Sequence, residues 1–300
     1  MTAIAVIGLG NMGHHMSVNL VKAGHDVQGY DLVPELCERA AAKDVTIAES
    51  AAAATAASSI VITMLPSGKH VLDLWGGADG IVAAAQPNTA FFDCSTISVD
   101  DARAAHEIAE DAGYLSIDAP VSGGVVGAEA GTLTFMVGGT AEAFDRAKPF
   151  LEIMGKRVVH CGEAGAGQAA KICNNLILGV SMIGVSEAFV LGEKLGLTHQ
   201  ALFDVAANAS GQCWSITTNC PVPGPVPSSP ANRDYAAGFS SQLMVKDLNL
   251  SQDAAKSSHT DTELAAHATK IYERLVDNSD PSRDFSDIIN DIRVRSKEVE

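Results

Sequence analysis

The stretch AIAVIGLGNMG, residues 3–13, decides the fold of this chain. Its first five residues are apolar and of strand length, the glycines follow at once, and the next residues, HHMSVNLVKAG, are compatible with a helix. A second strand pattern, DVQGYD, ends at Asp31, 18 residues after Gly13. A strand, a glycine turn, a helix and an acid about 20 residues further on are typical of a dinucleotide-binding unit.

Each glycine of the turn has its own role in this interpretation. Gly8 allows a tight turn, Gly10 lets the backbone approach a pyrophosphate, and Gly13 lets helix and strand pack closely. Asp31 would accept a hydrogen bond from a ribose 2′-hydroxyl and repel a 2′-phosphate, so we expect NAD in preference to NADP. Taken without its context, the same motif could be an ordinary glycine-rich turn.

Strand and helix patterns alternate through the first half of the chain. An alanine-rich helix at residues 48–57 precedes the strand SIVITMLP, and helical segments separate this strand from AFFDCST and YLSIDAP. The alternation predicts an α/β fold with a Rossmann-type, doubly wound, mostly parallel sheet. It ends near residue 163, and we expect an NAD-binding domain at residues 1–163.

The second half has a helical pattern. From Gly167 to about Gly196 the sequence is compatible with one long helix, whose apolar residues lie on every face and predict burial on all sides. No convincing strand follows it, so we expect an all-α domain at residues 164–300, joined to the first by the long helix. Residues 219–238 hold five of the eleven prolines, which excludes a helix there and predicts a loop that is either functional or disordered.

Composition excludes several classes of protein. The net charge of −16 argues against binding to nucleic acid or an anionic membrane surface. The longest apolar run is interrupted by Glu187, so we expect no membrane span, and the N-terminus lacks a signal-peptide pattern, so we expect a cytoplasmic protein. The six cysteines form no CxxC and the nine histidines no HExxH, so neither a disulfide framework nor a metal site is expected.

Two further stretches carry candidate chemistry. In DAPVSGG, Ser122, Gly123 and Gly124 offer a hydroxyl and backbone amides that could bind a carboxylate; a flexible loop is an equal alternative. In GQAAKICNN, Lys171 and Asn175 are four residues apart and share a helical face. The alternative for this pair is a lysine with its amine in solvent and a structural asparagine. Viewed alone, the VKD of LMVKDLNL indicates an exposed helix turn.

The combination of motifs resembles the β-hydroxyacid dehydrogenase family along nearly the whole chain. GLGNMG with NLVKAGHDV, DCST, DAPVSGG with GAEAGTL, GAGQAAKICNN and LMVKDLNL occur in family order. The resemblance implies a Rossmann domain, a helical domain that also forms the contact between subunits of a homodimer or homotetramer, and an active site in the cleft between the domains.

The resemblance also implies roles for individual residues. Lys171 matches the catalytic lysine and general base of the family, and Asn175 the asparagine beside it. Residues implied to bind substrate are Ser122, Gly123 and Gly124 at the carboxylate, with Trp214, Phe239 and Asp247 around the pocket. Residues implied to line NAD are Gly8, Gly10, Asn11, Met12, Gly13, Asp31, Leu65, Pro66, His70, Thr96 and Lys246.

Three stretches, NASGQCWS, CPVPGPVPSSP and YAAGFSSQLMVKDL, look most like the family members that oxidise (S)-3-hydroxyisobutyrate to methylmalonate semialdehyde in valine breakdown. One alternative is a short-chain semialdehyde or glyoxylate-type reductase of the same family. Another, from a different class, is a dinucleotide-binding sensor without catalysis.

The chain departs from the family pattern at three histidines. His14 and His15 stand where small residues or proline are usual, and His70 where asparagine is common. An imidazole at the start of the first helix would crowd the pyrophosphate or, if protonated, attract it, so these positions bear on cofactor affinity.

Overall fold

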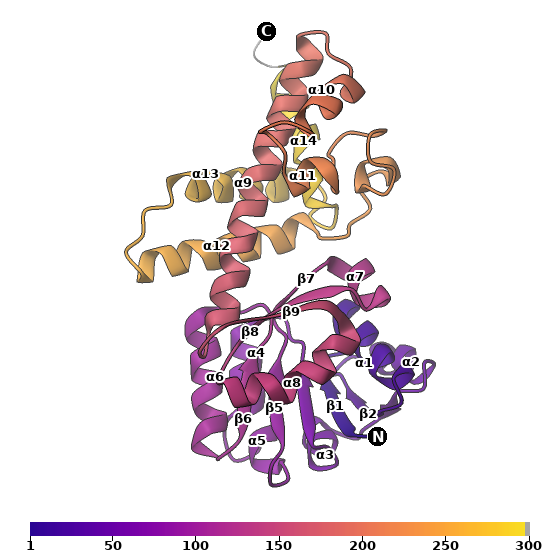
Figure 1. Ribbon diagram of the computed structural model, residues 1–300, viewed down its shortest axis with the longest axis vertical. Helices are drawn as coiled ribbons and strands as arrows, with labels where there is room; N and C mark the ends of the chain where they lie inside the picture. Colours follow the sequence, from indigo (N-terminus) through magenta and orange to yellow (C-terminus); the bar gives the residue numbers. More distant parts are fainter. Residues whose placement is uncertain (298–300) are drawn as a thin grey trace. The chain divides into compact units, whose positions relative to one another are not determined.

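The computed structural model describes residues 1–297 and divides the chain into two compact units (Figure 1). Unit 1 is Met1–Lys171, and unit 2 begins at Ile172. The division lies inside a long helix, whereas the sequence placed the domain boundary between residues 163 and 164.

Within the described residues, unit 1 is built on a nine-stranded sheet with the order β3-β2-β1-β4-β5-β6-β8-β7, and β9 pairs with β8. The first six strands pair in parallel, β8 runs antiparallel to β6 and β7, and β9 runs parallel to β8. The fold predicted from the sequence is therefore confirmed. The strands are β1 Ala3–Ile7, β2 Asp26–Tyr30, β3 Thr46–Ile47, β4 Ile60–Thr63, β5 Ala90–Asp93, β6 Leu115–Asp118, β7 Val121–Ser122, β8 Leu133–Gly138 and β9 Gly155–Gly162.

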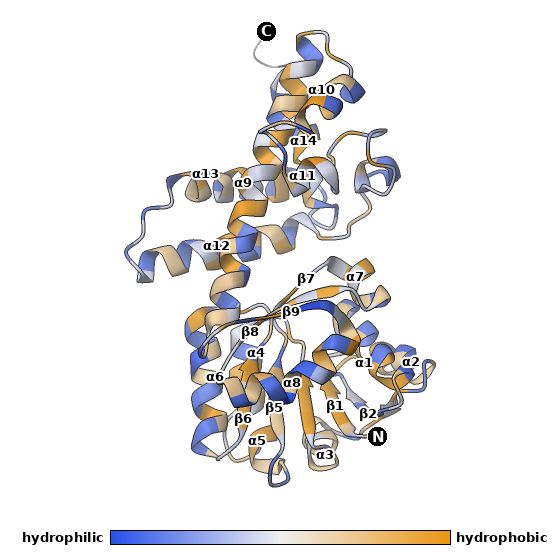
Figure 2. Ribbon diagram, in the orientation of Figure 1, coloured by the Kyte–Doolittle hydropathy of each residue, from blue (hydrophilic) through white to orange (hydrophobic). Residues whose placement is uncertain are grey.

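Two hydrophobic cores form on the two faces of this sheet because successive strand side chains point to opposite faces. In β1, Ile4 and Val6 join the core that contains α1 and α8, while Ala5 and Ile7 join the core that contains α4 and α6. Figure 2 shows the central strands as hydrophobic, as expected for a sheet covered on both sides. The helices of unit 1 are α1 Asn11–Lys22, α2 Pro34–Ala41, α3 Ala51–Ala56, α4 Gly68–Trp75, α5 Ile81–Ala84, α6 Val99–Asp111, α7 Gly124–Ala130 and α8 Ala141–Met154.

The strand order reverses at β1, which lies between β2 and β4. In sheets of this kind, ligands bind outside the carboxyl ends of the strands at such a reversal. The loops after β1, β4, β5 and β6 leave the sheet at this same edge because these strands are parallel. This edge of unit 1 is therefore where a site is expected.

The regular elements of unit 2 are helices in its described residues, and loops connect them. Two apolar clusters hold it together: one centres on Met182, Met244 and Tyr272, the other on Phe189, Ile216 and Tyr235. Its elements are α9 Ala166–Lys194, which begins in unit 1, α10 His199–Ala206, α11 Trp214–Thr217, η1 Pro230–Arg233, α12 Ser241–Ser257, α13 Glu263–Asn278, η2 Phe285–Asp287 and α14 Ile288–Arg295.

The long helix predicted from Gly167 to about Gly196 is α9, but its predicted burial on all sides is wrong for a single chain. Ile177 is 64% exposed and Leu191 59% exposed, and Gly184 on the same face is also exposed. The helix is long and apolar enough to cross a membrane by length and composition alone. A core helix of a soluble protein meets the same criterion, and half of its most apolar window is buried.

The proline-rich segment is an ordered loop with one turn of 3-10 helix, η1. The prediction that no helix forms here is wrong for this turn, because Pro230 stands at its first position, where no backbone N–H is needed. Tyr235 ties the loop together: its hydroxyl donates to the Pro221 carbonyl at 2.9 Å, and its backbone N–H donates to the Pro230 carbonyl at 2.9 Å.

Candidate functional site

The glycine loop after β1 has the geometry of a dinucleotide turn. Gly8 has φ +94°, and a Cβ added there would lie 2.3 Å from the Met64 carbonyl oxygen. A Cβ at Gly13 would lie 1.9 Å from the Gly8 carbonyl oxygen, whereas one at Gly10 would meet no atom within 4 Å. Gly8 and Gly13 are thus required by the protein's own packing, and the open space is at Gly10, where a pyrophosphate would approach the backbone.

Asp31 and Arg39 hold this loop from two sides. The Asp31 carboxylate accepts from the Leu9 N–H at 2.7 Å and from the Val33 N–H at 2.9 Å. The Arg39 guanidinium donates to the carbonyl oxygens of Leu9 at 2.8 Å and Gly10 at 3.0 Å. Asp31 therefore stands at the carboxyl end of β2 beside the glycine loop, as a ribose-binding acid must. Arg39 was not singled out from the sequence.

The first turn of α1 carries the two unusual histidines. Asn11 is exposed and Met12 half-buried at this end of the helix, and the His14 N–H makes a helical bond to the Gly10 carbonyl. The His14 ring is buried and meets the His15 ring edge to face. Burial, followed by the nearby Arg39 charge, lowers the pKa of His14. His14 is therefore neutral near pH 7, and the expected attraction between its charge and a pyrophosphate does not arise at that pH.

The loops after β4 and β5 are joined by hydrogen bonds. The Leu65 N–H donates to the Ser95 hydroxyl at 2.8 Å, and that hydroxyl donates to the Asp93 carboxyl at 2.6 Å. Thr96 follows Ser95 and is half-buried. Burial raises the pKa of Asp93 to about 6 despite its hydrogen bonds to Ser95 and Thr63.

Two other candidates of the β4 loop reach solvent. Pro66 is exposed, and so is His70 in α4, whose Nδ1 lies 2.7 Å from the Ser67 hydroxyl. Both therefore lie at the surface of the edge where the strands end.

Ser122, Gly123 and Gly124 form an ordered turn at the same edge. Ser122 ends β7, which pairs with β8, and α7 begins at Gly124. Gly123 has φ +135° and Gly124 φ +62°, conformations that favour glycine. Gly123 is exposed. The segment is thus a defined turn rather than a structureless loop, and its amides could face an anion.

Lys171 is a buried residue in the first turns of α9. The start of this helix is held by Asp118 at the end of β6, whose carboxylate accepts from the N–H groups of Gly165 and Gln168, both at 2.8 Å. His106 contacts the same carboxylate through Nε2 at 3.0 Å. The helix therefore leaves the sheet edge in a fixed position.

In unit 2, one turn further along α9, Asn175 is buried and donates through Nδ2 to the carboxylate of Asp247 in α12. Its Oδ1 accepts from the Asn174 side chain at 2.9 Å. Asp247 is buried and Lys246 half-buried. The local interpretation of this stretch as an exposed helix turn is therefore wrong for Asp247.

The remaining two substrate candidates also lie in unit 2. Trp214 begins α11 and is 50% exposed. Phe239 is half-buried just before α12, and its N–H donates to the Asp284 carboxylate at 3.2 Å. Its ring meets that of Phe285 edge to face.

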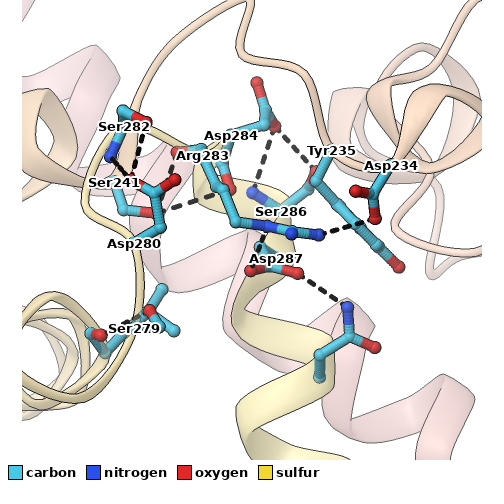
Figure 3. Close-up of polar contacts among 12 residues, drawn as sticks. Asp234, Tyr235, Ser241, Ser279, Asp280, Ser282, Arg283, Asp284, Ser286 and Asp287 are labelled. Atoms are coloured by element: carbon cyan, nitrogen blue, oxygen red, sulfur yellow. Dashed lines mark hydrogen bonds and ion pairs between the residues drawn. The ribbon is translucent and has the colours of Figure 1, made fainter.

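Asp284 organises the segment that leads into α12 (Figure 3). This buried carboxylate accepts from the Gly238 and Phe239 N–H groups, from Ser286 and from the Asn219 side chain at the start of the proline-rich loop. Next to it, Arg283 forms ion pairs with Asp234 and Asp287 at 3.0 and 2.9 Å. Asp284 was not singled out from the sequence, because it belongs to none of the motifs recognised there.

The structure thus gathers the sequence candidates into two groups. One lies at the carboxyl edge of the sheet in unit 1 and includes the glycine loop, Asp31, Thr96, the Ser122–Gly124 turn and Lys171. The other, in unit 2, is built around the Asn175–Asp247 hydrogen bond. Within residues 1–297 no group of three or more His, Cys, Asp or Glu side chains could hold a metal ion, and the six cysteines are free.

Comparisons with known proteins cover nearly the whole chain. The profile of the NAD-binding domain of 6-phosphogluconate dehydrogenase matches residues 3–162. A second profile, described as NAD-binding of NADP-dependent 3-hydroxyisobutyrate dehydrogenase, matches residues 165–292.

Individual relatives align almost from end to end. A protein of Mycobacterium tuberculosis named probable 3-hydroxyisobutyrate dehydrogenase is 53% identical over 297 residues, 99% of each chain. An NAD-dependent L-serine dehydrogenase of Pseudomonas aeruginosa is 44% identical over 95% of this chain and 96% of its own. A solved structure of the M. tuberculosis 3-hydroxyisobutyrate dehydrogenase with L-serine superposes with a TM-score of 0.93, at 53% identity, over 98% of this chain and 99% of that one.

Proposed function

Because the chain belongs to the 3-hydroxyisobutyrate dehydrogenase family, we propose that it oxidises the primary alcohol of (S)-3-hydroxyisobutyrate to methylmalonate semialdehyde, a step of valine breakdown. The observation that carries this proposal is a buried lysine and asparagine on one face of a helix that starts at the sheet edge bearing the dinucleotide loop. A sensor that had lost catalysis would have no need of that pair.

NAD is the cofactor, and the residues of unit 1 fit it. The open backbone at Gly10 accommodates a pyrophosphate, and Asp31 is placed to accept from a ribose hydroxyl. Leu65 and Pro66 lie on the loop after β4, Thr96 lies on the loop after β5, and His70 lies in α4. In this proposal the remaining half of the dinucleotide passes along these segments. The chemistry that bound NAD supplies is acceptance of the hydride from the carbinol carbon.

Lys171 takes the general-base role in this proposal. Its amine accepts the hydroxyl proton as the C–O bond of the alcohol becomes a carbonyl and the hydride leaves the same carbon. Burial favours this role because it disfavours the protonated form of a lysine. Asn175 positions the reacting oxygen, and its hydrogen bond to Asp247 fixes the orientation of its amide.

The substrate carboxylate binds the turn Ser122–Gly124 through a hydroxyl and backbone amides. For Trp214, Phe239 and Lys246 of unit 2 we propose the roles that the family resemblance implies, which are substrate binding for the first two and cofactor binding for Lys246. The support for these assignments is the family resemblance together with the ordered backbone of the turn and the anchoring of Phe239 by Asp284.

A second candidate substrate is L-serine, which differs from 3-hydroxyisobutyrate by an ammonium group in place of the methyl group. Two observations favour it: the relative named NAD-dependent L-serine dehydrogenase and the relative solved with L-serine. An ammonium group inside a pocket needs a hydrogen-bonding partner, whereas a methyl group needs an apolar wall. The glyoxylate-type reductase receives no such support.

We further propose that the enzyme is a cytoplasmic homodimer or homotetramer. The exposed apolar face of α9, with Ile177 and Leu191, supports self-association because such a face is stabilised by being covered. The net charge of −16 disfavours nucleic acid as a partner, because nucleic acid is also negatively charged.

The test is a comparison of substrates under initial-rate conditions. Purified enzyme is given NAD with (S)-3-hydroxyisobutyrate, (R)-3-hydroxyisobutyrate, L-serine or glycolate, and NADH absorbance is followed. The proposal expects the highest kcat/KM with (S)-3-hydroxyisobutyrate. A higher value with L-serine would reassign the substrate, and no activity with any of the four would contradict the proposed chemistry.

A further inference from the structure

Gln168, in the first turn of α9, has a fully buried side chain, 0% exposed. Its amide nitrogen donates to the Ser95 carbonyl at 2.8 Å, and its amide oxygen accepts from the Ile97 N–H at 3.2 Å. These two backbone groups belong to the peptide bonds on either side of Thr96. The Gln168 amide therefore holds the backbone of the loop after β5 on both sides of Thr96, a residue that the family resemblance implies to line NAD.

The chemistry of the two contacts requires a carboxamide. A backbone carbonyl only accepts and a backbone N–H only donates, so the group that meets both must offer one donor and one acceptor. A carboxylate at this position would place an oxygen against the Ser95 carbonyl, and an apolar side chain would leave both backbone groups buried without partners. Such groups are costly to leave unsatisfied.

The backbone of Gln168 is fixed independently of its side chain. Its N–H donates to Asp118 at the end of β6, and the neighbouring Gly167 has no room for a Cβ, which would lie 2.3 Å from the Met136 carbonyl. The first turn of α9 is thus anchored on β6 and β8. Because the Gln168 backbone is held in place, the hydrogen bonds of its side chain also hold the β5 loop in place.

The same series of hydrogen bonds continues to the loop after β4. Ser95, whose carbonyl Gln168 holds, accepts from the Leu65 N–H through its hydroxyl at 2.8 Å. Both loops that follow β4 and β5 at the carboxyl edge are thereby connected to the helix that carries Lys171, three residues beyond Gln168 and on the same side of α9.

We propose that Gln168 is a positioning residue that sets the place of the Thr96 loop, and with it the bound nicotinamide, relative to Lys171. This inference rests on the proposed function for its catalytic consequence, but not for its consequence on cofactor binding. It predicts that losing the carboxamide weakens NADH binding and slows hydride transfer together.

The experiment uses the full chain and two variants of similar volume. Gln168→Glu keeps the acceptor and loses the donor, and Gln168→Met loses both. Gln200→Glu and Gln200→Met are matched controls, because Gln200 is exposed on α10 and contacts Asp204. The measurements are the NADH Kd by fluorescence titration, kcat, and the primary deuterium isotope effect on kcat with hydroxyacid deuterated at the carbinol carbon.

We expect each Gln168 variant to raise the NADH Kd by about tenfold, the consequence of one or two lost buried hydrogen bonds, while the Gln200 controls match the wild type. We also expect the isotope effect to rise, because misplacement slows the hydride step itself. A merely structural residue would lower the active fraction, so apparent kcat would fall while Kd and isotope effect stayed unchanged. That pattern, or wild-type values throughout, overturns the proposal.

Two provisions keep the outcome decisive. If both variants fail to fold by circular dichroism, Gln168→Asn, which keeps the carboxamide but is one methylene too short to span both peptides, is measured in their place with the same expected changes. If the wild type binds NADH but oxidises none of the four hydroxyacids, the proposed function fails while the Kd comparison still decides the role of Gln168.

Discussion

The side-chain amide of Asn175 donates a hydrogen bond to the carboxylate of Asp247, a residue 72 positions further along the chain. Both side chains are buried and cannot hydrogen-bond to bulk water. The bond between them therefore gives the Asn175 amide an acceptor and the Asp247 carboxylate a donor. The contact joins α9 to α12 within unit 2. It also leaves the Asn175 amide with a defined orientation, because the nitrogen must face the carboxylate.

Replacing Asp247 tests whether this orientation matters for catalysis. Asp247→Ala leaves the Asn175 amide without its carboxylate partner, and we expect kcat to fall together with a loss of about 1–3 kcal/mol in the free energy of unfolding. Asp247→Asn keeps an acceptor oxygen and should recover much of both. Urea denaturation and initial rates provide the measurements. Asp253→Ala, exposed on the same helix, is the control, and a kcat for Asp247→Ala equal to this control would exclude the orienting role.

Lys171→Arg separates a general base from an anchor. Arginine keeps the positive charge and the donors but stays protonated at ordinary pH, so it cannot accept the hydroxyl proton. We expect kcat at saturating hydroxyacid to fall by about 10²- to 10⁴-fold, with NADH binding retained. Lys156→Arg at an exposed position of β9 should have no effect. A variant that keeps more than about a tenth of the wild-type kcat would assign the proton to another group.

Asp31 governs the choice of cofactor. We expect kcat/KM with NAD to exceed that with NADP by at least roughly tenfold, about 1.4 kcal/mol in transition-state terms. Asp31→Ala should narrow this ratio because the repulsion of a 2′-phosphate disappears. It should also weaken NAD binding, since the Leu9 N–H loses its acceptor. Asp26→Ala, exposed at the start of the same strand, is the comparison. Equal use of both cofactors by the unaltered enzyme would contradict the assignment.

A side chain at Gly123 should interfere with the carboxylate turn. Gly123→Ala places a Cβ 3.1 Å from Cδ2 of Leu133 and puts a side chain on a backbone with φ +135°. The Leu133 side chain must move slightly and the turn is strained, so we expect a raised KM for the hydroxyacid. Any left-handed alanine also costs roughly 1–2 kcal/mol of stability. Gly113→Ala supplies that strain in open space, at φ +80° before β6. If the two variants show the same KM, the carboxylate binds elsewhere.

Asp93 should make stability depend on pH. Its pKa is raised to about 6 in the folded protein from 3.8, so the folded state binds its proton more tightly than the unfolded chain. The contribution of Asp93 to the free energy of unfolding is therefore largest below about pH 4 and falls as the pH rises to about 6, by a total on the order of 3 kcal/mol. Asp93→Asn cannot ionise and lacks this fall. The measurement is the unfolding free energy of the wild type minus that of Asp93→Asn, determined in urea from pH 4 to 7. This difference should fall as the pH rises, and a constant difference would contradict the raised pKa.

Local signals in the sequence predicted much of this protein. The glycine loop, Asp31 and the alternating strands and helices depend on turn chemistry and periodicity, which act between residues close in the chain. The same holds for the helix beginning near Gly167. The positions of Lys171 and Asn175 on one face of it follow from their spacing alone.

Only the tertiary structure decided which distant groups meet. The side-chain amide of Gln168 hydrogen-bonds to backbone groups more than 70 residues earlier in the chain. Asp247 accepts a hydrogen bond from Asn175, 72 residues away, and Asp284 accepts one from the backbone N–H of Phe239. None of these contacts has a local pattern, because a buried donor or acceptor is satisfied by whatever group the packing brings to it. The sequence also did not reveal that one face of α9 is exposed. Hydrophobicity is a property of each residue, whereas burial depends on which other parts of the protein cover that residue.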